Sequence, residues 1–187
     1  NRFWKKTTRH QEWQLGETLV TGIGQGFLLT SPLQLATMAA RLANGGLAVK
    51  PHIAQKTGTR VRETETWPSM GLNPKHLALV REGLFRVVNS PTGTAYGSRI
   101  KDKGLEMAGK TGSAQVRRIT ETERKTGVVK NDDLPWKERD HALFIAYAPV
   151  ETPRYAVAVV VEHGGSGAQM AAPIARDLLK ECQIRLG

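Results

Sequence analysis

Two apolar segments constrain the fold of this chain most strongly. Residues 142–148 and 155–162 are almost entirely apolar at odd and even positions alike, and only a short connector, 149–154, separates them. A strand with one solvated face alternates apolar and polar residues, whereas a strand covered on both faces does not. The connector begins with Pro149 and indicates a reversal of the chain. The two segments therefore predict paired antiparallel strands inside a layered fold.

Segments 32–44, 74–88 and 168–185 have the spacing of amphipathic helices. The first two begin at a proline that follows Ser31 and Asn73, which are typical helix caps. Their predicted apolar faces are, in chain order, Leu35, Met38, Ala39 and Leu42; Leu77, Val80, Leu84 and Val87; and Ala171, Ile174, Ala175, Leu178, Leu179 and Cys182. The lone cysteine is thus expected to pack rather than to react.

These elements predict a mixed α/β (α+β) fold, built as an antiparallel sheet with flanking helices. The predicted strands are 107–117, 142–148 and 155–162, with the helix 168–185 across one face and the helices 32–44 and 74–88 at the other side of a cleft or on its floor. The length of 187 residues suits one domain with a substantial core.

Four remaining segments have weaker signals. Residues 1–20 are polar, basic and aromatic and predict a loop packed on its own domain. Residues 47–53 predict a short strand, and residues 55–72 a loop. Residues 117–140 form a long charged excursion, for which Trp136 is the expected anchor.

The charge balance leaves a binding function open. Lys and Arg exceed Asp and Glu by 27 to 17, which gives a net charge of +10. Such a surplus suits an anionic partner, so a basic module that binds nucleic acid or an acidic glycan is one hypothesis, and a merely solubilising surface is the other. Residues 21–27, T-G-I-G-Q-G-F, do not keep the spacing of a dinucleotide-binding loop, and we expect no cofactor. His141 and His163 lack partners at ligand spacing, and we expect no metal.

Residues 107–116, M-A-G-K-T-G-S-A-Q-V, combine small residues with one lysine and two hydroxyls. On a strand, Thr111 and Ser113 project from the same face. With the cation of Lys110 beside them, they are suited to hold a carboxylate and to leave a backbone N–H free for a developing oxyanion. Glycines at 109 and 112 suggest that another group approaches the backbone closely.

The K-T-G triplet occurs three times, beginning at Lys56, Lys110 and Lys125. The first copy leads into a polar, charged segment, and the third lies in a highly charged stretch that we predict to be a solvated loop. Only the copy at Lys110 is surrounded by small residues and followed by two strong strands and a helix. Context therefore selects this copy as the functional one.

The order of these motifs resembles the end of the transpeptidase domain of class B penicillin-binding proteins, in particular their elongation-type branch. The resemblance runs from about Trp4 to Leu179. It rests on T-G-I-G-Q-G-F-L-L-T-S-P-L-Q-L-A, L-A-N-G-G, N-P-K-H-L-A-L-V-R-E-G-L-F-R-V-V-N, A-G-K-T-G-S-A-Q-V, R-D-H-A-L-F-I-A-Y-A-P and E-H-G-G-S-G. In that family the domain is a D,D-transpeptidase with a β-lactamase-like fold, which cross-links peptidoglycan stem peptides and is acylated by β-lactams.

The resemblance implies a role for each residue of the central motif. Lys110 would be the catalytic cation at the centre of the site, and Thr111 and Ser113 would bind the substrate's terminal carboxylate. Gly112 would keep the strand open for the substrate, and the Ser113 backbone N–H would supply half of the oxyanion hole. The resemblance also implies membrane elongation-complex partners and a place at the periplasmic face of the bacterial inner membrane, with no nucleic acid bound.

The sequence departs from the family pattern in one respect. The family's nucleophile and base form an S-x-x-K motif, and a second serine lies in S-x-N. No S-x-N is present, and the single S-x-x-K, Ser98 to Lys101, has loop-like flanks. We therefore expect 1–187 to be the C-terminal portion of the domain, cut from a longer chain that does not begin at Asn1, and inactive alone. A β-lactam sensor or β-lactamase of the same fold is the remaining alternative.

Overall fold

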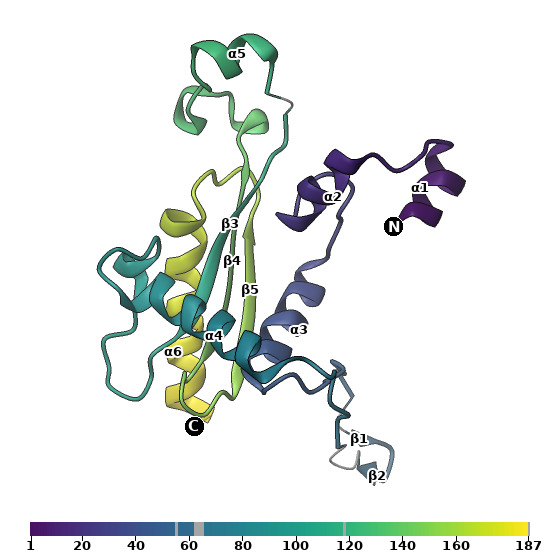
Figure 1. Ribbon diagram of the computed structural model, residues 1–187. Helices are drawn as coiled ribbons and strands as arrows, with labels where there is room; N and C mark the ends of the chain where they lie inside the picture. The colour runs from purple at the N-terminus through teal and green to yellow at the C-terminus, as the bar shows by residue number, and fades with distance from the viewer. Residues whose placement is uncertain (55, 62–65, 118, 187) are drawn as a thin grey trace. The chain divides into compact units, whose positions relative to one another are not determined.

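The computed structural model describes residues 1–54, 56–61, 66–117 and 119–186 (Figure 1). It comprises two compact units, Asn1–Ser31 and Pro32–Gly187. Parts of two predicted segments, the loop 55–72 and the excursion 117–140, lie outside the described residues. None of the helices in the described ranges is long and apolar enough to cross a lipid bilayer.

The first unit contains two helices, α1 (Arg2–Arg9) and α2 (Leu15–Gly22), so the prediction of a loop over 1–20 was wrong. Neither helix has a wide apolar stripe. Instead, the Asn1 side chain accepts a hydrogen bond from the Trp4 N–H at 2.8 Å, and buried Lys5 pairs with Glu17 at 2.7 Å. A cap and an ion pair stabilise these short helices. Neither feature produces a periodic apolar pattern, so the sequence pattern did not indicate helices here.

The second unit is built on the predicted antiparallel sheet. Its strands are β3 (Ala108–Ala114), β4 (His141–Ala148) and β5 (Tyr155–Val161), in the order β3-β4-β5 (Figure 1). The register pairs Lys110 with Ile145 and Ser113 with Ala142. The three predicted strands are confirmed, and β3 lies at an edge with one strand neighbour.

Helix α6 (Ala172–Leu186) covers one face of this sheet, after a π-helical turn at Gly167–Ala171 (Figure 1). Phe144 of β4 packs there against the helix in the main core. The predicted apolar face was too wide, because Ile174 and Leu178 are 50% and 48% exposed. The sheet covers a single row of the helix, which consists of Ala172, Ala175, Leu179 and Gln183. The small alanines allow close packing, and Cys182 is only partly buried beside them.

The two helices predicted at 32–44 and 74–88 are α3 (Pro32–Ala43) and α4 (Pro74–Asn89), and both contact the side of the sheet opposite α6. Ala43 of α3 and Leu84 of α4 share a core with Ala108 and Tyr147, which are cross-strand neighbours. The predicted cap of α4 is confirmed, because the Asn73 side chain accepts a hydrogen bond from the Lys75 N–H at 2.9 Å. Asn89 ends α4, and its side-chain amide donates to the Met107 carbonyl at 3.0 Å, which fastens the helix to the segment before β3.

The predicted strand at 47–53 is not a strand. A single bridge joins Leu47 to Ser69, and the Arg41 guanidinium donates to the Val49 carbonyl through Nε and Nη2 at 3.1 and 3.0 Å. A helix side chain therefore uses an acceptor that a strand partner would need. Within the loop predicted for 55–72, two-residue strands β1 (Lys56–Thr57) and β2 (Arg60–Val61) form a small hairpin.

The excursion 117–140 is more ordered than predicted. Helix α5 (Glu121–Thr126) contains most of the third K-T-G copy, so the solvated-loop prediction there was wrong. Two 3-10 turns follow, at Asn131–Asp133 and Trp136–Glu138. Trp136 contacts the His163 ring at 4.5 Å between centroids but remains 58% exposed, so it anchors the segment only at its rim.

Helix α5 depends on one carboxylate, and its stability should therefore depend on pH. Glu123 pairs with Arg117 at 2.6 Å and accepts hydrogen bonds from the Thr120 backbone N–H and hydroxyl. The Arg117 guanidinium, and then these Thr120 donors, lower the pKa of Glu123 from 4.5 to about 2. The unfolded segment binds its proton first, so this stabilisation is complete above about pH 4.5 and is lost as the pH falls towards 2.

We expect amide-exchange protection over 120–127 to fall across that pH range. Glu123→Gln, which cannot titrate, should show lower protection with no such pH dependence. Protection in the unmodified chain that stays constant down to pH 2 would contradict this role.

Candidate active site at the edge of the sheet

The four predicted site residues follow one another on β3, whose outer edge has no strand neighbour in the described part of the chain. Thr111 lies opposite Phe144 in the register, and Ser113 lies opposite Ala142. Paired residues project from the same face, so both hydroxyls lie on one face, as predicted, and that face is the α6 side of the sheet. Lys110, one position out of phase, starts from the opposite face.

The Lys110 side chain is exposed and returns to its own strand. Its Nζ donates to the Thr111 carbonyl at 2.9 Å and to Thr111 Oγ1 at 3.2 Å. Among the residues that the structure describes, no carboxylate pairs with Lys110. The ammonium group is therefore available to an incoming anion, while its contact with Thr111 holds it near the strand.

Thr94 is a site residue that the sequence patterns did not indicate. Its Oγ1 lies 3.3 Å from Thr111 Oγ1, which extends the row of polar groups begun by Lys110. Gly93 places it there, because a Cβ at Gly93 would collide with the carbonyls of Arg86 and Val87 at the end of α4. The only sequence signal was a glycine in a connector next to a helix end, which is too common to indicate a site.

Ser113 is exposed at the other end of the motif. Its hydroxyl lies 3.5 Å from the Gly165 carbonyl, a long hydrogen bond that leaves an oxygen lone pair free. Ser113 lines a hollow of about 550 Å³, whose other lining residues include Trp136, Arg139 and Glu162. The Ser113 end of the motif thus borders a space large enough for part of a ligand.

The two glycines of the motif have different surroundings. A Cβ at Gly109 would lie 2.7 Å from Cζ of Phe144, so the close approach predicted there is made by the protein's own core. A Cβ at Gly112 would meet Leu143 Cβ at 3.4 Å, an ordinary contact. No contact with its own strand neighbour therefore requires glycine at 112.

The other K-T-G copies lie in different settings. Lys56 begins the two-residue strand β1, and Lys125 lies on α5, where it pairs with Glu121 one helical turn away at 2.9 Å. Neither copy lies on the three-stranded sheet. The S-x-x-K match at Ser98 also lacks the helix that this motif requires. Ser98 is buried in a 3-10 turn, and Lys101 is exposed beyond the end of that turn.

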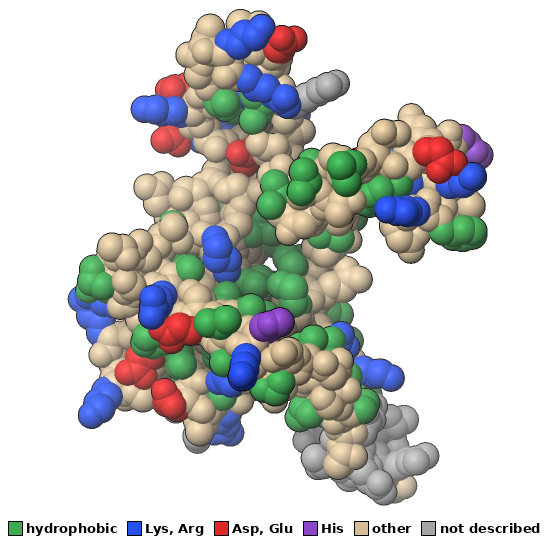
Figure 2. Space-filling model, in the orientation of Figure 1, with side chains coloured by type: hydrophobic (Ala, Val, Ile, Leu, Met, Phe, Trp, Pro, Cys, Tyr) green, Lys and Arg blue, Asp and Glu red, His purple; other side chains and the backbone are tan. Residues whose placement is uncertain are grey.

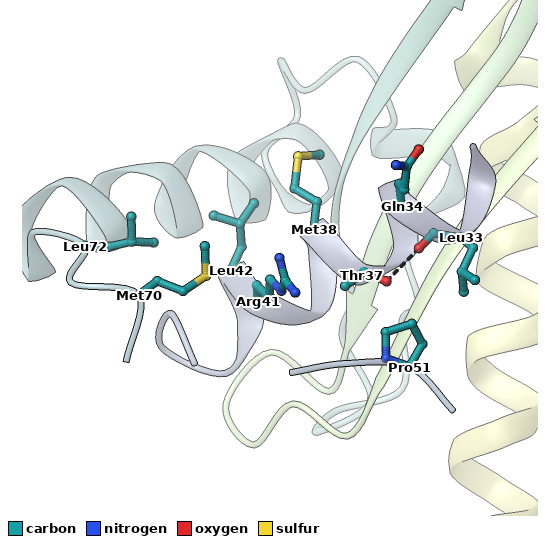
Figure 3. Close-up of a pocket in the computed structure, with 9 residues that line it drawn as sticks. All are labelled: Leu33, Gln34, Thr37, Met38, Arg41, Leu42, Pro51, Met70 and Leu72. Carbon is teal, nitrogen blue, oxygen red and sulfur yellow. Dashed lines mark hydrogen bonds between the residues drawn. The ribbon is translucent and has the colours of Figure 1, made fainter. Parts of the chain in front are cut away.

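A second hollow, of about 410 Å³, lies between α3 and the segments around Pro51 and Met70 (Figure 3). Its walls are largely apolar, and Arg41 is its one charged lining residue. No residue of the central motif lines it. Among its described lining residues, the one hydroxyl, that of Thr37, donates to the Leu33 carbonyl of its own helix at 2.7 Å, and no carboxylate, histidine or lysine accompanies it.

The positive charge is dispersed. On the face drawn in Figure 2, Lys and Arg side chains are interspersed with acidic and uncharged groups. Cations that form ion pairs include Lys5, Lys6, Arg86, Arg117, Lys125, Arg176, Lys180 and Arg185. In the first unit, the Trp4 ring packs against the Phe27 ring with 5.6 Å between centroids, so it already has an aromatic partner within the protein. These features do not favour a nucleic-acid platform.

His141 and His163 lie together at the end of the sheet, with ring centroids 4.7 Å apart. The His163 backbone N–H donates to Nδ1 of His141 at 2.9 Å. No group of three or more His, Cys, Asp or Glu side chains in the described part of the chain is arranged to hold a metal ion. Each ring forms a hydrogen bond with a backbone group, His141 with the His163 N–H and His163 with the Arg139 carbonyl.

An antiparallel sheet between helices, with K-T-G on its open edge, is the arrangement that the resemblance implied. Residues 5–180 match the family of the penicillin binding protein transpeptidase domain, and the chain belongs to that family. The predicted family and fold class are confirmed.

Individual relatives within this family share the name peptidoglycan D,D-transpeptidase MrdA. The peptidoglycan D,D-transpeptidase MrdA of Acinetobacter baumannii is 36% identical over 93% of this chain, which spans 26% of that protein. MrdA of Salmonella typhimurium is 31% identical over 96% of this chain and 29% of its own length. The chain thus spans little more than a quarter of these curated relatives.

Solved structures agree. Penicillin-binding protein 2 of Pseudomonas aeruginosa, in complex with WCK 5153, matches with a TM-score of 0.77 and 36% identity, over 99% of this chain and 36% of that one. The same protein of Helicobacter pylori, in complex with MreC, matches with a TM-score of 0.77 and 32% identity, over 100% of this chain and 31% of that one. The predicted similarity to elongation-type penicillin-binding protein 2 is confirmed.

Proposed function

We propose that this chain forms one wall of the active site of a peptidoglycan D,D-transpeptidase. The observation that carries the proposal is the row Lys110, Thr111 and Thr94 along the open edge of β3, with Ser113 at the mouth of a hollow. An edge strand with a free ammonium group and hydroxyls is suited to bind an extended peptide that ends in a carboxylate.

Each residue has a proposed role. Thr111 and Ser113 hold the terminal carboxylate of the stem peptide, and Lys110 supplies the positive field beside it. The Ser113 N–H donates to the oxyanion that develops when the D-Ala–D-Ala carbonyl is attacked. Gly112 leaves room for the substrate strand. A β-lactam, which carries a carboxylate near its reactive carbonyl, would use the same contacts.

The covalent step requires groups that these 187 residues do not contain. In the proposed reaction a serine of an S-x-x-K motif attacks the carbonyl, and its lysine accepts the hydroxyl proton. The C–N bond to the terminal D-Ala breaks as its amine takes that proton and leaves. An amine of a second stem peptide then attacks the acyl-serine, the serine C–O bond breaks, and the proton lost by the amine returns to the serine oxygen. We propose that the complete enzyme contributes that serine, its lysine and the S-x-N serine, and that this chain is the C-terminal portion of the domain.

Location and partners follow the same proposal. Substrate of this kind lies outside the cytoplasm, which suggests the periplasmic face of the inner membrane. The Helicobacter pylori relative was solved as a complex with MreC, and we propose an equivalent elongation-complex partner for this chain. The names of the relatives favour a transpeptidase over a β-lactam sensor or a β-lactamase.

The test is to label the complete protein with a fluorescent penicillin. We expect one adduct per molecule, mapped by peptide mass spectrometry to an S-x-x-K serine outside this chain. The same protein should release D-Ala from a pentapeptide substrate in a penicillin-sensitive manner. A complete protein that takes up no penicillin, or hydrolyses it rapidly, would refute the transpeptidase assignment.

A further inference from the structure

The turn that follows β5 is fastened to the sheet next to the site. The His163 N–H donates to Nδ1 of His141 at 2.9 Å, and the Gly165 N–H donates to the Asp140 carbonyl at 2.8 Å. Nδ1 of His163 lies 3.0 Å from the Arg139 carbonyl, to which it donates. These bonds hold the turn against the start of β4, opposite the end of β3.

Gly167, at the end of this turn, contacts the central motif through backbone alone. A Cβ at Gly167 would collide with the Leu143 carbonyl and would lie 2.7 Å from the oxygen and 3.2 Å from the nitrogen of Gly112. Gly167 does not have a positive φ, so space rather than backbone conformation requires glycine there. The glycine of the K-T-G triplet is therefore packed against a second glycine, which follows β5 at the same end of the sheet.

The two sides of this contact are not equally able to move. Gly167 begins the π-helical turn that leads into α6, and Ala171 and Ala172 in that junction are fully buried. β3 has one strand neighbour, and its end at Ser113 is exposed. A side chain at 167 would therefore press on Leu143 of β4 and on Gly112 of β3, and of these two strands the edge strand β3, with its Gly112–Ser113 part, is the freer to move.

We infer that Gly167 is a positioning residue for the carboxylate grip, by which we mean the Thr111 and Ser113 hydroxyls proposed to bind the substrate carboxylate. The inference rests on the proposed function: by allowing the backbones of 112 and 167 to touch, Gly167 sets where the Ser113 hydroxyl and N–H lie. It does not touch the substrate. Displacement of such groups by about 1 Å costs on the order of a hundredfold in rate when they orient a reacting group.

The experiment separates the carboxylate grip from general damage. In the complete protein, the acylation rate constant is measured with benzylpenicillin and with its methyl ester, which lacks the anion. Gly167→Ala is expected to slow both reactions through the displaced Ser113 N–H, and to slow reaction with the acid by roughly tenfold more than reaction with the ester. The ratio of the two rates therefore falls towards one. Gly83→Ala is the matched control, because a Cβ there meets nothing within 4 Å.

A second variant loosens the turn without adding bulk. His141→Ala removes the acceptor of the His163 N–H and should lower the same ratio, so the inference remains testable if Gly167→Ala does not fold. An equal loss for acid and ester, or an unchanged ratio in both variants, would overturn it. An unmodified protein that reacts with neither compound would instead refute the proposed function.

Discussion

Lys110→Ala in the complete protein is expected to slow acylation by penicillin by roughly tenfold to a hundredfold. Lys110 Nζ has no carboxylate partner in the described structure, and it lies at the open edge of β3 with two contacts to Thr111. A charge-assisted contact with the ligand carboxylate stabilises the complex and the transition state by about 1.5–3 kcal/mol. Stopped-flow measurement with a fluorescent penicillin gives the rate constant directly.

The other K-T-G copies provide matched controls. Lys125→Ala removes only an exposed pair with Glu121, and Lys56→Ala changes a two-residue strand. Exposed pairs of this kind stabilise by less than about 1 kcal/mol, so both variants should acylate at the unmodified rate. Equal losses in all three variants would show that the position on the sheet does not determine function.

The sheet could be predicted because its signals are local and redundant. The segments at 142–148 and 155–162 allow no other placement than a covered sheet, and β4 and β5 match them closely. Helices α3 and α4 carry a proline at their first position, and that signal does not depend on distant contacts. Such signals can be recognised in the sequence without knowledge of the tertiary fold.

Errors arose where distant contacts decide the outcome. Helical periodicity predicted that Ile174 and Leu178 lie on the buried face of α6, yet the facing sheet is too narrow to cover them and both are half exposed. The strand predicted at 47–53 does not form, because the Arg41 guanidinium, on α3, donates a hydrogen bond to the Val49 carbonyl that a strand partner would need. Single-sequence patterns contain neither the width of a partner surface nor the reach of a remote side chain.

The candidate site was predictable only in part, for the same reason. Spacing alone placed the Thr111 and Ser113 hydroxyls on one face, and the register agrees. The contribution of Thr94 depends on how Gly93 packs against the end of α4, and the contact between Gly112 and Gly167 joins two segments that are far apart in the sequence. Their functional roles remain predictions, which the acylation measurements on the complete protein test.

The largest effect is expected from the chain by itself: incubated with penicillin, these 187 residues should form no covalent adduct. Acyl transfer requires a nucleophile with a base within hydrogen-bond reach. In the described structure, no Lys or His side chain forms a hydrogen bond with the hydroxyls of Ser69, Ser90, Ser98, Ser113 or Ser166. Ser31 immediately precedes Pro32, where the sequence predicts a helix cap.

Ser98 is the serine that most needs to be tested, because Lys101 follows at the formal S-x-x-K spacing. On a helix, residues three apart lie on one face, and burial there would lower the pKa of such a lysine enough to make it a base. Ser98 instead ends a 3-10 turn at 4% exposure, and Lys101 lies beyond that turn in solvent. Intact-mass spectrometry of the chain with benzylpenicillin should therefore show the unmodified mass, with the complete protein as the positive control. A stoichiometric mass increase on the chain, lost in Ser98→Ala, would show that these residues contain a nucleophile of their own.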